Sequence, residues 1–129
     1  MLETGIKGRQ EVIVTKENTA AALGSGLLDV FATPAMIALM ECTAWKSVAD
    51  QLGEDEGTVG THLDVAHLSA TPLGMKVYCE SELVQVDGRK LVFKVAAYDE
   101  AGLIGEGTHE RFIVKNEKFQ AKAEAKGAK

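Results

Sequence analysis

The chain has 129 residues, of which 46% are hydrophobic and 26% charged, and its formal net charge is −5. This length suits one domain that buries roughly two thirds of the surface its unfolded chain exposes. The composition is that of a globular protein and excludes a mainly disordered chain. Because 19 acidic residues outnumber 14 basic ones, there is no basic field to attract nucleic acid.

The N-terminal sequence MLETGIKGRQ lacks the apolar core of a signal peptide, and no apolar run approaches the roughly 20 residues that cross a bilayer. We therefore expect a cytoplasmic protein without a membrane partner. Cys42 and Cys79 fit no metal-ligand or redox spacing such as C-x-x-C, and we interpret them as reduced core thiols.

The first predicted elements are a short strand over residues 11–15 and a brief helical stretch in KENTAAALGSG, which ends at glycines. The strongest element is a helix over residues 34–52. Thr33 is a candidate N-cap, Pro34 takes the favoured first helical position, and a glycine follows the helix. The apolar residues that recur at spacings of three and four are Met36, Ile37, Met40, Ala44, Val48 and Leu52.

The remainder of the chain predicts strands separated by turns, over residues 58–69, 75–86, 91–98 and 104–114. One long helix and about five strands predict an α+β domain over residues 1–115, an antiparallel sheet wrapped around a single central helix. The Lys/Ala-rich tail, residues 116–129, is expected to fray or to form a weak exposed helix. We assign no function to the tail.

Two polar residues interrupt the apolar pattern. Glu41 lies beside the apolar stripe of the helix, and His67 shares the apolar face of its strand with Val59, Leu63 and Val65. Strict alternation places Gly60 on the other face. A sheet around a helix could bring Glu41 and His67 together. Each also has a plainer explanation, a surface glutamate with a buried stem and a satisfied core histidine.

A metal site is not predicted, although His62, Asp64 and His67 lie close together in sequence. In a regular strand His62 and Asp64 share one face and His67 points to the other, so only a β-bulge would bring all three together. His109 is taken as a packed or surface residue and receives no role.

Three segments, VFATPAMIALME, GTHLDVAHLSATPLG and GEGTHERFIV, together resemble the fluoroacetyl-CoA thioesterase family of hot dog proteins. The resemblance covers about residues 10–115. It implies Thr33, Glu41 and His67 as catalytic residues, with Gly60 and Arg111 lining the same site. It also implies the hot dog fold, a homodimer with active sites at the interface, and an acyl-CoA substrate. No separate cofactor is implied, because coenzyme A is part of the substrate.

The segment before the long helix differs from the fluoroacetyl-selective pattern of that family, which has aromatic residues there. The sequence AALGSGLLDV has none before Phe31, which we keep as a candidate for substrate binding. A different small or medium acyl chain is therefore expected, carried by coenzyme A or by acyl carrier protein.

Thioester hydrolysis needs a nucleophile, proton transfer and stabilisation of an oxyanion. We expect the substrate carbonyl near the N-terminus of the long helix, where backbone N–H groups are free. The Thr33 hydroxyl could attack or hold the attacking water, Glu41 could act as nucleophile or general base, and His67 could transfer protons.

Two questions stay open from the sequence. Arg111 could contact the phosphates of coenzyme A or pair with a carboxylate such as Glu110 or Glu106. The whole chain could also be a non-catalytic acyl-CoA or small-ligand binding module, or a dehydratase acting on acyl thioesters, because a fold does not fix a function.

Overall fold

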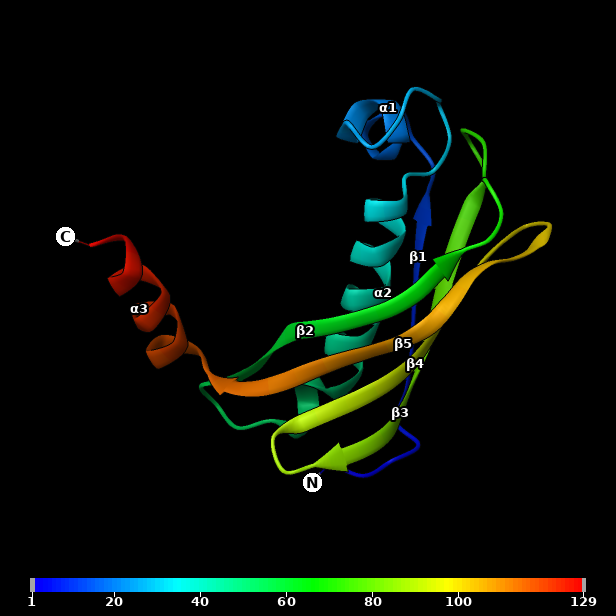
Figure 1. The fold of residues 1–129 in the computed structure, drawn as a ribbon. Coiled ribbons are helices and arrows are strands. Elements are labelled where there is room, and N and C mark those ends of the chain that lie inside the picture. Colours follow the sequence, from blue (N-terminus) through cyan, green and yellow to red (C-terminus); the bar gives the residue numbers. More distant parts are fainter. Residues whose placement is uncertain (1, 129) are drawn as a thin grey trace.

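The computed structural model describes residues 2–128. A five-stranded antiparallel sheet curves around one long helix, α2 (Thr33–Val48) (Figure 1). The strands are β1 (Lys7–Ile13), β2 (Glu56–His67), β3 (Lys76–Asp87), β4 (Lys90–Asp99) and β5 (Gly102–Lys115). Their order across the sheet is β1-β3-β4-β5-β2. The predicted α+β architecture is therefore confirmed.

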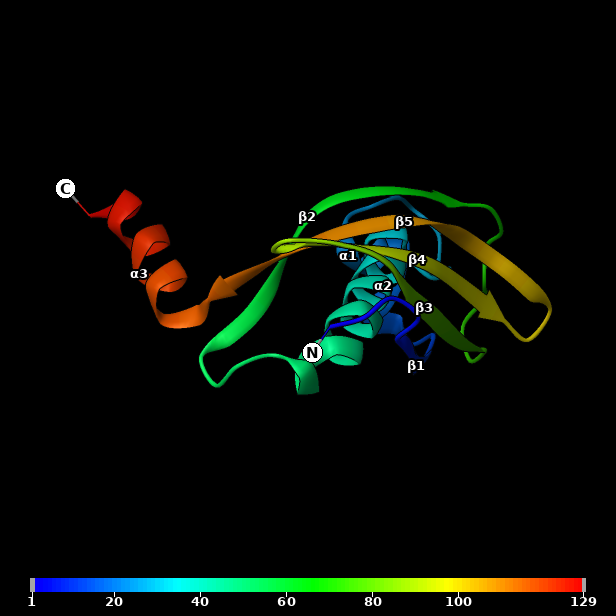
Figure 2. The same ribbon diagram turned by 90° about the horizontal axis from the view of Figure 1, so that it is seen from below.

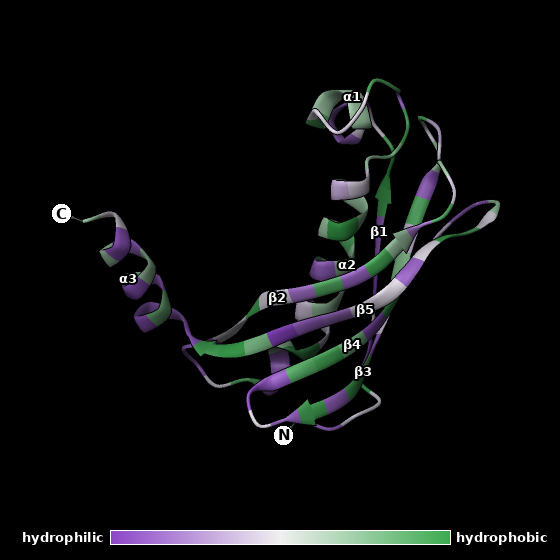
Figure 3. Ribbon diagram, in the orientation of Figure 1, coloured by the Kyte–Doolittle hydropathy of each residue, from purple (hydrophilic) through white to green (hydrophobic). Residues whose placement is uncertain are grey.

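The core lies between α2 and the concave face of the sheet, as Figure 2 shows from below. Hydrophobic and hydrophilic residues alternate along the strands (Figure 3), which is expected of a sheet with one face on a helix and the other toward water. The largest fully buried side chains include Phe31, Phe93, Met36, Met40, Leu83 and Leu91.

The boundaries of the first strand and of the helix differ from those predicted. β1 spans Lys7–Ile13 rather than residues 11–15, because the whole segment pairs with β3; exposed and half-buried residues alternate along it. The α-helix ends at Val48 and continues as a 3-10 turn, η2 (Ala49–Gln51), instead of reaching residue 52.

The buried stripe of α2 is centred slightly differently from the predicted one. Leu39 and Thr43 are buried, whereas Ile37 is only half-buried at the flank of the stripe. The N-cap is Ala32, which makes no side-chain cap hydrogen bond, and Thr33 is the first helical residue. The predicted N-cap role of Thr33 is therefore wrong, and its hydroxyl is free for another partner.

A β-bulge in β2 changes which residues share a face. The pairing of β2 with β5 shifts between Gly60 and His62, so Gly60 lies opposite Arg111 and His67 lies opposite Gly105. A bulge places two residues opposite one and resets the alternation. The prediction that Gly60 and His67 occupy opposite faces is wrong, because both face the helix.

Two helical segments lie outside this core. Short η1 (Lys16–Asn18) and α1 (Ala20–Leu23) sit beyond the N-terminus of α2 (Figure 1). At the other end, α3 (Asn116–Gly127) extends away from the sheet and has no buried residue. The tail thus forms the exposed helix that was one of its predicted states, and the division of the chain at residue 115 stays a prediction.

Both cysteines are free thiols, and burial raises the pKa of Cys79 to about 11. Such a thiol is a poor nucleophile at neutral pH. No helix in residues 2–128 is long and apolar enough to cross a membrane.

Candidate active site

The first candidate group is a hydroxyl–imidazole pair made by Thr33 and His67. Thr33 is the first residue of α2 and His67 the last residue of β2, and Thr33 Oγ1 lies 2.7 Å from His67 Nδ1. The helix and strand come close here because Gly105, opposite His67, has no side chain; a Cβ there would meet Met36 Sδ at 2.6 Å. A hydroxyl in contact with an imidazole is the arrangement of an activated nucleophile.

The imidazole of His67 is held in a state that suits a base. Burial lowers the pKa of His67 below its ordinary value of 6.5, and the Ser69 backbone opposes this to a smaller extent. Nε2 is buried, and among the described residues it has no partner that satisfies hydrogen-bond geometry. The neutral ring is therefore favoured at neutral pH, and Nδ1 can accept the Thr33 proton.

A pocket of about 280 Å³ opens beside this pair. Its walls include Ala20, Ser25, Phe31, Thr33, His67 and Ser69. Phe31 is 2% exposed and also borders a second cavity of about 560 Å³ between β1 and α2. The Phe31 ring is therefore a wall shared by the two spaces, and its predicted contact with substrate remains a prediction.

The second candidate group, which we call the Glu41 cluster, consists of Glu41, Thr58, Gly60, His109 and Arg111. Glu41 Oε2 lies 3.7 Å from Arg111 Nη1, and the two side chains are 38% and 7% exposed. Gly60 permits this approach, because a Cβ there would lie 2.5 Å from the same carboxylate oxygen. The prediction that Glu41 lies beside the apolar stripe is confirmed.

Arg111 is held by neutral partners inside the protein. Its Nε donates to Thr58 Oγ1 at 2.7 Å and its Nη2 to the Thr58 carbonyl at 2.9 Å, while Nη1 lies 3.1 Å from His109 Nε2. Burial lowers the pKa of Arg111, and the charge of Glu41 raises it. A contact from Arg111 to coenzyme A phosphates stays a prediction.

The carboxylate beside Arg111 is that of Glu41, and not that of Glu110 or Glu106, the two candidates considered from the sequence. Glu110, one position before Arg111, instead pairs with Lys90 at 3.5 Å. Successive strand residues point to opposite faces, so Glu110 cannot follow Arg111 to the helix side.

The two groups do not meet within one chain. Glu41 lies eight residues beyond Thr33 on α2, which is about 12 Å along the helix. Gly60 and His67 are seven positions apart on β2, or about 20 Å of strand. The expectation that Glu41 and His67 come together is therefore not met in a single protomer.

Sequence reasoning missed two members of the Glu41 cluster, Thr58 and His109. His109 stands two residues before Arg111 and therefore shares its face of β5. That spacing was the available signal for His109. Thr58 stands two residues before Gly60 and shares its face of β2 in the same way, although only the bulge turns that face toward the helix.

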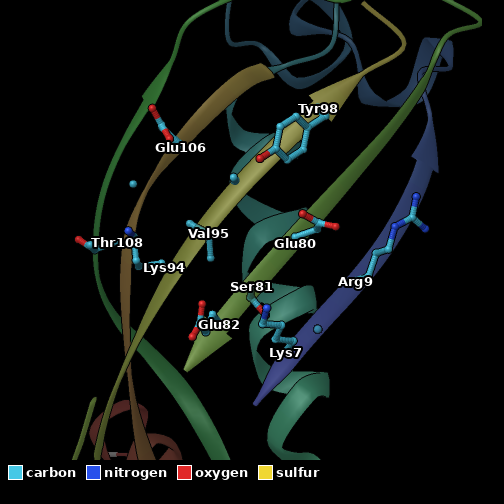
Figure 4. A pocket seen from close by; sticks show the side chains of 13 residues that line it. Lys7, Arg9, Glu80, Ser81, Glu82, Lys94, Val95, Tyr98, Glu106 and Thr108 are labelled. Atoms are coloured by element: carbon cyan, nitrogen blue, oxygen red, sulfur yellow. The ribbon is translucent and has the colours of Figure 1, made fainter. Parts of the chain in front are cut away.

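A larger cavity, of about 680 Å³, lies elsewhere, on the outer face of the sheet (Figure 4). Its walls carry Lys7, Arg9 and Lys94 among Glu80, Glu82 and Glu106. We place the chemistry in the smaller pocket, because that is where a hydroxyl touches an imidazole. Within residues 2–128, no three His, Cys, Asp or Glu side chains are grouped to hold a metal ion.

Comparison with known proteins gives the family. The family model described as fluoroacetyl-CoA-specific thioesterase matches residues 14–117. The fluoroacetyl-CoA thioesterase of Streptantibioticus cattleyicolor is 44% identical over 98 residues, covering 76% of this chain and 70% of that protein.

Solved structures agree with this match. A structure of the fluoroacetyl-CoA thioesterase FlK superposes with a TM-score of 0.93 at 36% identity over 98% of both chains. A Thermus thermophilus protein described as a thioesterase superfamily member has a TM-score of 0.86 at 30% identity, covering 95% of this chain and 91% of its own. The predicted hot dog fold and family are confirmed. The chain belongs to the fluoroacetyl-CoA-specific thioesterase family.

Proposed function

We propose that this protein hydrolyses acyl-CoA thioesters to a free acid and coenzyme A. The observation that carries the proposal is the 2.7 Å contact between Thr33 Oγ1 and His67 Nδ1 at the N-terminus of α2. The chemistry of the relatives supports it: the curated relative is named a fluoroacetyl-CoA thioesterase, and an FlK variant has been solved in complex with fluoroacetate and CoA.

In this mechanism, neutral His67 takes the hydroxyl proton of Thr33, or of a water held by Thr33, as the oxygen attacks the thioester carbonyl. The first turn of a helix leaves N–H groups without helical acceptors, and these favour the developing oxyanion. Collapse of the intermediate breaks the C–S bond, and the proton on His67 passes to the coenzyme A sulfur. Where Thr33 is the nucleophile, water then hydrolyses the acyl ester.

Glu41 enters the proposal through a second protomer. β2 is a 12-residue edge strand, paired on one side only, and such an edge can accept another strand. Antiparallel pairing of two β2 strands about a two-fold axis sets the Gly60 end of one against the His67 end of the other. In such a homodimer, Glu41 of one protomer would face the hydroxyl–imidazole pair of its partner and could act there as nucleophile or general base.

The volume of the pocket bears on the size of the acyl group. The pocket of about 280 Å³ lies just below the usual range for ligand sites, roughly 300–1,000 Å³. This supports a small or medium acyl chain. A cytoplasmic location, with no cofactor other than the coenzyme A of the substrate, completes the proposal.

The first experiment measures thiol release from a panel of short, branched, aromatic and halogenated acyl-CoAs. Wild-type protein is compared with Glu41→Ala and His67→Ala at equal folded concentration. We expect turnover on part of the panel and a loss of about 10²- to 10⁴-fold in both variants. Ligand-induced stabilisation without thiol release would instead favour the non-catalytic binding module.

A mixing experiment tests the shared site. Glu41→Ala and His67→Ala protomers are unfolded together and refolded, so that half of the dimers are mixed. A mixed dimer has one intact site when Glu41 and His67 come from different protomers, and activity returns to about a quarter of wild type. No recovery, with mixed dimers verified by mass, would place both residues in one protomer's site.

A further inference from the structure

We propose that His109 is a positioning residue that holds the Arg111 guanidinium, and through it the Glu41 carboxylate, in the orientation used for hydrolysis. The inference rests on the proposed function, in which Glu41 takes part in the reaction.

The hydrogen bonds of His109 define its tautomer. Its side chain is fully buried, and Nδ1 lies 2.9 Å from the carbonyl oxygen of His62. A carbonyl can only accept, so Nδ1 carries the proton. Nε2 then has a free lone pair and accepts from Arg111 Nη1 at 3.1 Å. One ring thus provides a donor on one side and an acceptor on the other.

The surroundings of His109 favour this neutral ring. Burial is the main effect that lowers the pKa of His109, and the positive charge of Arg111 lowers it further; the His62 carbonyl, Glu41 and Glu110 oppose this. A protonated His109 would have no acceptor at Nε2 and would place two buried cations side by side.

The guanidinium is held without the help of Glu41. Thr58 accepts from Nε and Nη2, and His109 accepts from Nη1, so all three nitrogens have neutral acceptors. Because the guanidinium is planar, these partners fix its plane. The distance of 3.7 Å to Glu41 Oε2 is longer than a hydrogen bond. The carboxylate is therefore attracted toward Nη1 while remaining 38% exposed, available to substrate or water.

A purely structural role would not need the second ring nitrogen. Phe93 packs beside His109 with ring centroids 6.4 Å apart, so an apolar side chain could fill the same space. Only the acceptor at Nε2 connects His109 to Arg111. The inference therefore predicts that retaining an acceptor matters more than retaining the volume.

The test compares His109→Leu with His109→Gln. Leu keeps volume but has no acceptor, whereas the Gln amide oxygen can accept from Arg111. We expect kcat of His109→Leu to fall about 10- to 100-fold with KM little changed, as for a small misplacement of a reacting group. His109→Gln should recover most of that loss. In the Glu41→Ala background, His109→Leu should cost no further activity, because the effect passes through Glu41.

A second measurement does not depend on activity or on the folding of His109→Leu. The ring ¹⁵N signals of wild-type His109 should show a protonated Nδ1 and an unprotonated Nε2 at neutral pH. A proton on Nε2, equal losses in the Leu and Gln variants, or full activity in His109→Leu would each overturn the inference. A wild-type protein without turnover would refute the proposed function, while the ¹⁵N signals would still decide the tautomer of His109.

Discussion

The two ends of strand β2 present different kinds of polar group. At the His67 end, the hydroxyl–imidazole pair borders a pocket, and one imidazole nitrogen has no hydrogen-bond partner among residues 2–128. At the Gly60 end, the Glu41 cluster surrounds a buried guanidinium whose three nitrogens all have neutral acceptors. In the proposed mechanism the first group moves a proton, and the second holds a charge in a fixed position.

This difference indicates that proton transfer and the orientation of a charge can be assigned to separate groups of one site. A reacting pair must reach substrate and change protonation, so complete satisfaction of its hydrogen bonds would oppose the reaction. A charge that orients a carboxylate is most effective when its own position is fixed in advance. Changes at the two ends should therefore have different consequences for activity and stability.

After Glu41→Ala and His67→Ala, the largest effect is expected from Thr33→Val, which removes the hydroxyl but keeps the shape of the side chain. Thr33 is exposed and caps no helix, so the melting temperature should hardly change. Turnover should fall by about 10²-fold or more, because the proton donor to His67 is lost. Thr33→Ser is the matched control and should retain a substantial part of the rate in the same thiol-release assay. Unchanged turnover in Thr33→Val would remove Thr33 from the mechanism.

A smaller effect is expected from Gly60→Ala. The new Cβ would lie 2.5 Å from Glu41 Oε2 and 3.2 Å from His109 Cε1. The carboxylate is the flexible end of a side chain, so it should move away at little cost in stability. We expect roughly a 10-fold lower kcat, with a change in the free energy of unfolding below about 1 kcal/mol. The rate assay checks kcat, and a denaturant titration checks the free energy of unfolding. A large loss of stability with normal kcat would contradict this prediction.

The pH dependence of kcat should follow the protonation of His67. Burial holds the pKa of folded His67 below 6.5, so the neutral base persists at pH 7 and is lost as pH falls through that lowered pKa. The same shift contributes stability above the unfolded value of about 6.5, and this contribution also disappears at lower pH. We expect the acid limb of kcat to have its midpoint below pH 6.5. A midpoint above that value in wild type would argue against neutral His67 as the base.

The smallest effect is expected from removing residues 118–129. Helix α3 has no buried residue, and the hydrogen bond from Asn116 N to the Asp55 carbonyl would be kept. The change in the free energy of unfolding should be within about 0.5 kcal/mol, and kcat should be unchanged. A marked loss of either, measured by denaturant titration and thiol release, would contradict this prediction.

The sequence by itself determined the outline of this protein. The apolar spacing of α2, Pro34 near its start, and the alternating strands specify an α+β domain, because these patterns act over a few neighbouring residues. Glu41 and His67 could also be selected, since a carboxylate beside an apolar helix stripe and an imidazole on an apolar strand face are visible as local exceptions. Resemblance supplied Thr33 as a catalytic residue and Gly60 and Arg111 as lining residues. It named none of the three partners of Arg111, which are Thr58, His109 and Glu41.

The tertiary structure alone decided how those residues are grouped. The β-bulge between Gly60 and His62 brought Thr58 and Gly60 to the helix side, and strict alternation cannot reveal such an insertion. The same register paired Arg111 with Glu41 rather than with Glu110, and made His109 its neutral acceptor. These arrangements depend on contacts between residues far apart in the chain, whose geometry exists only when the strands and helix are packed together.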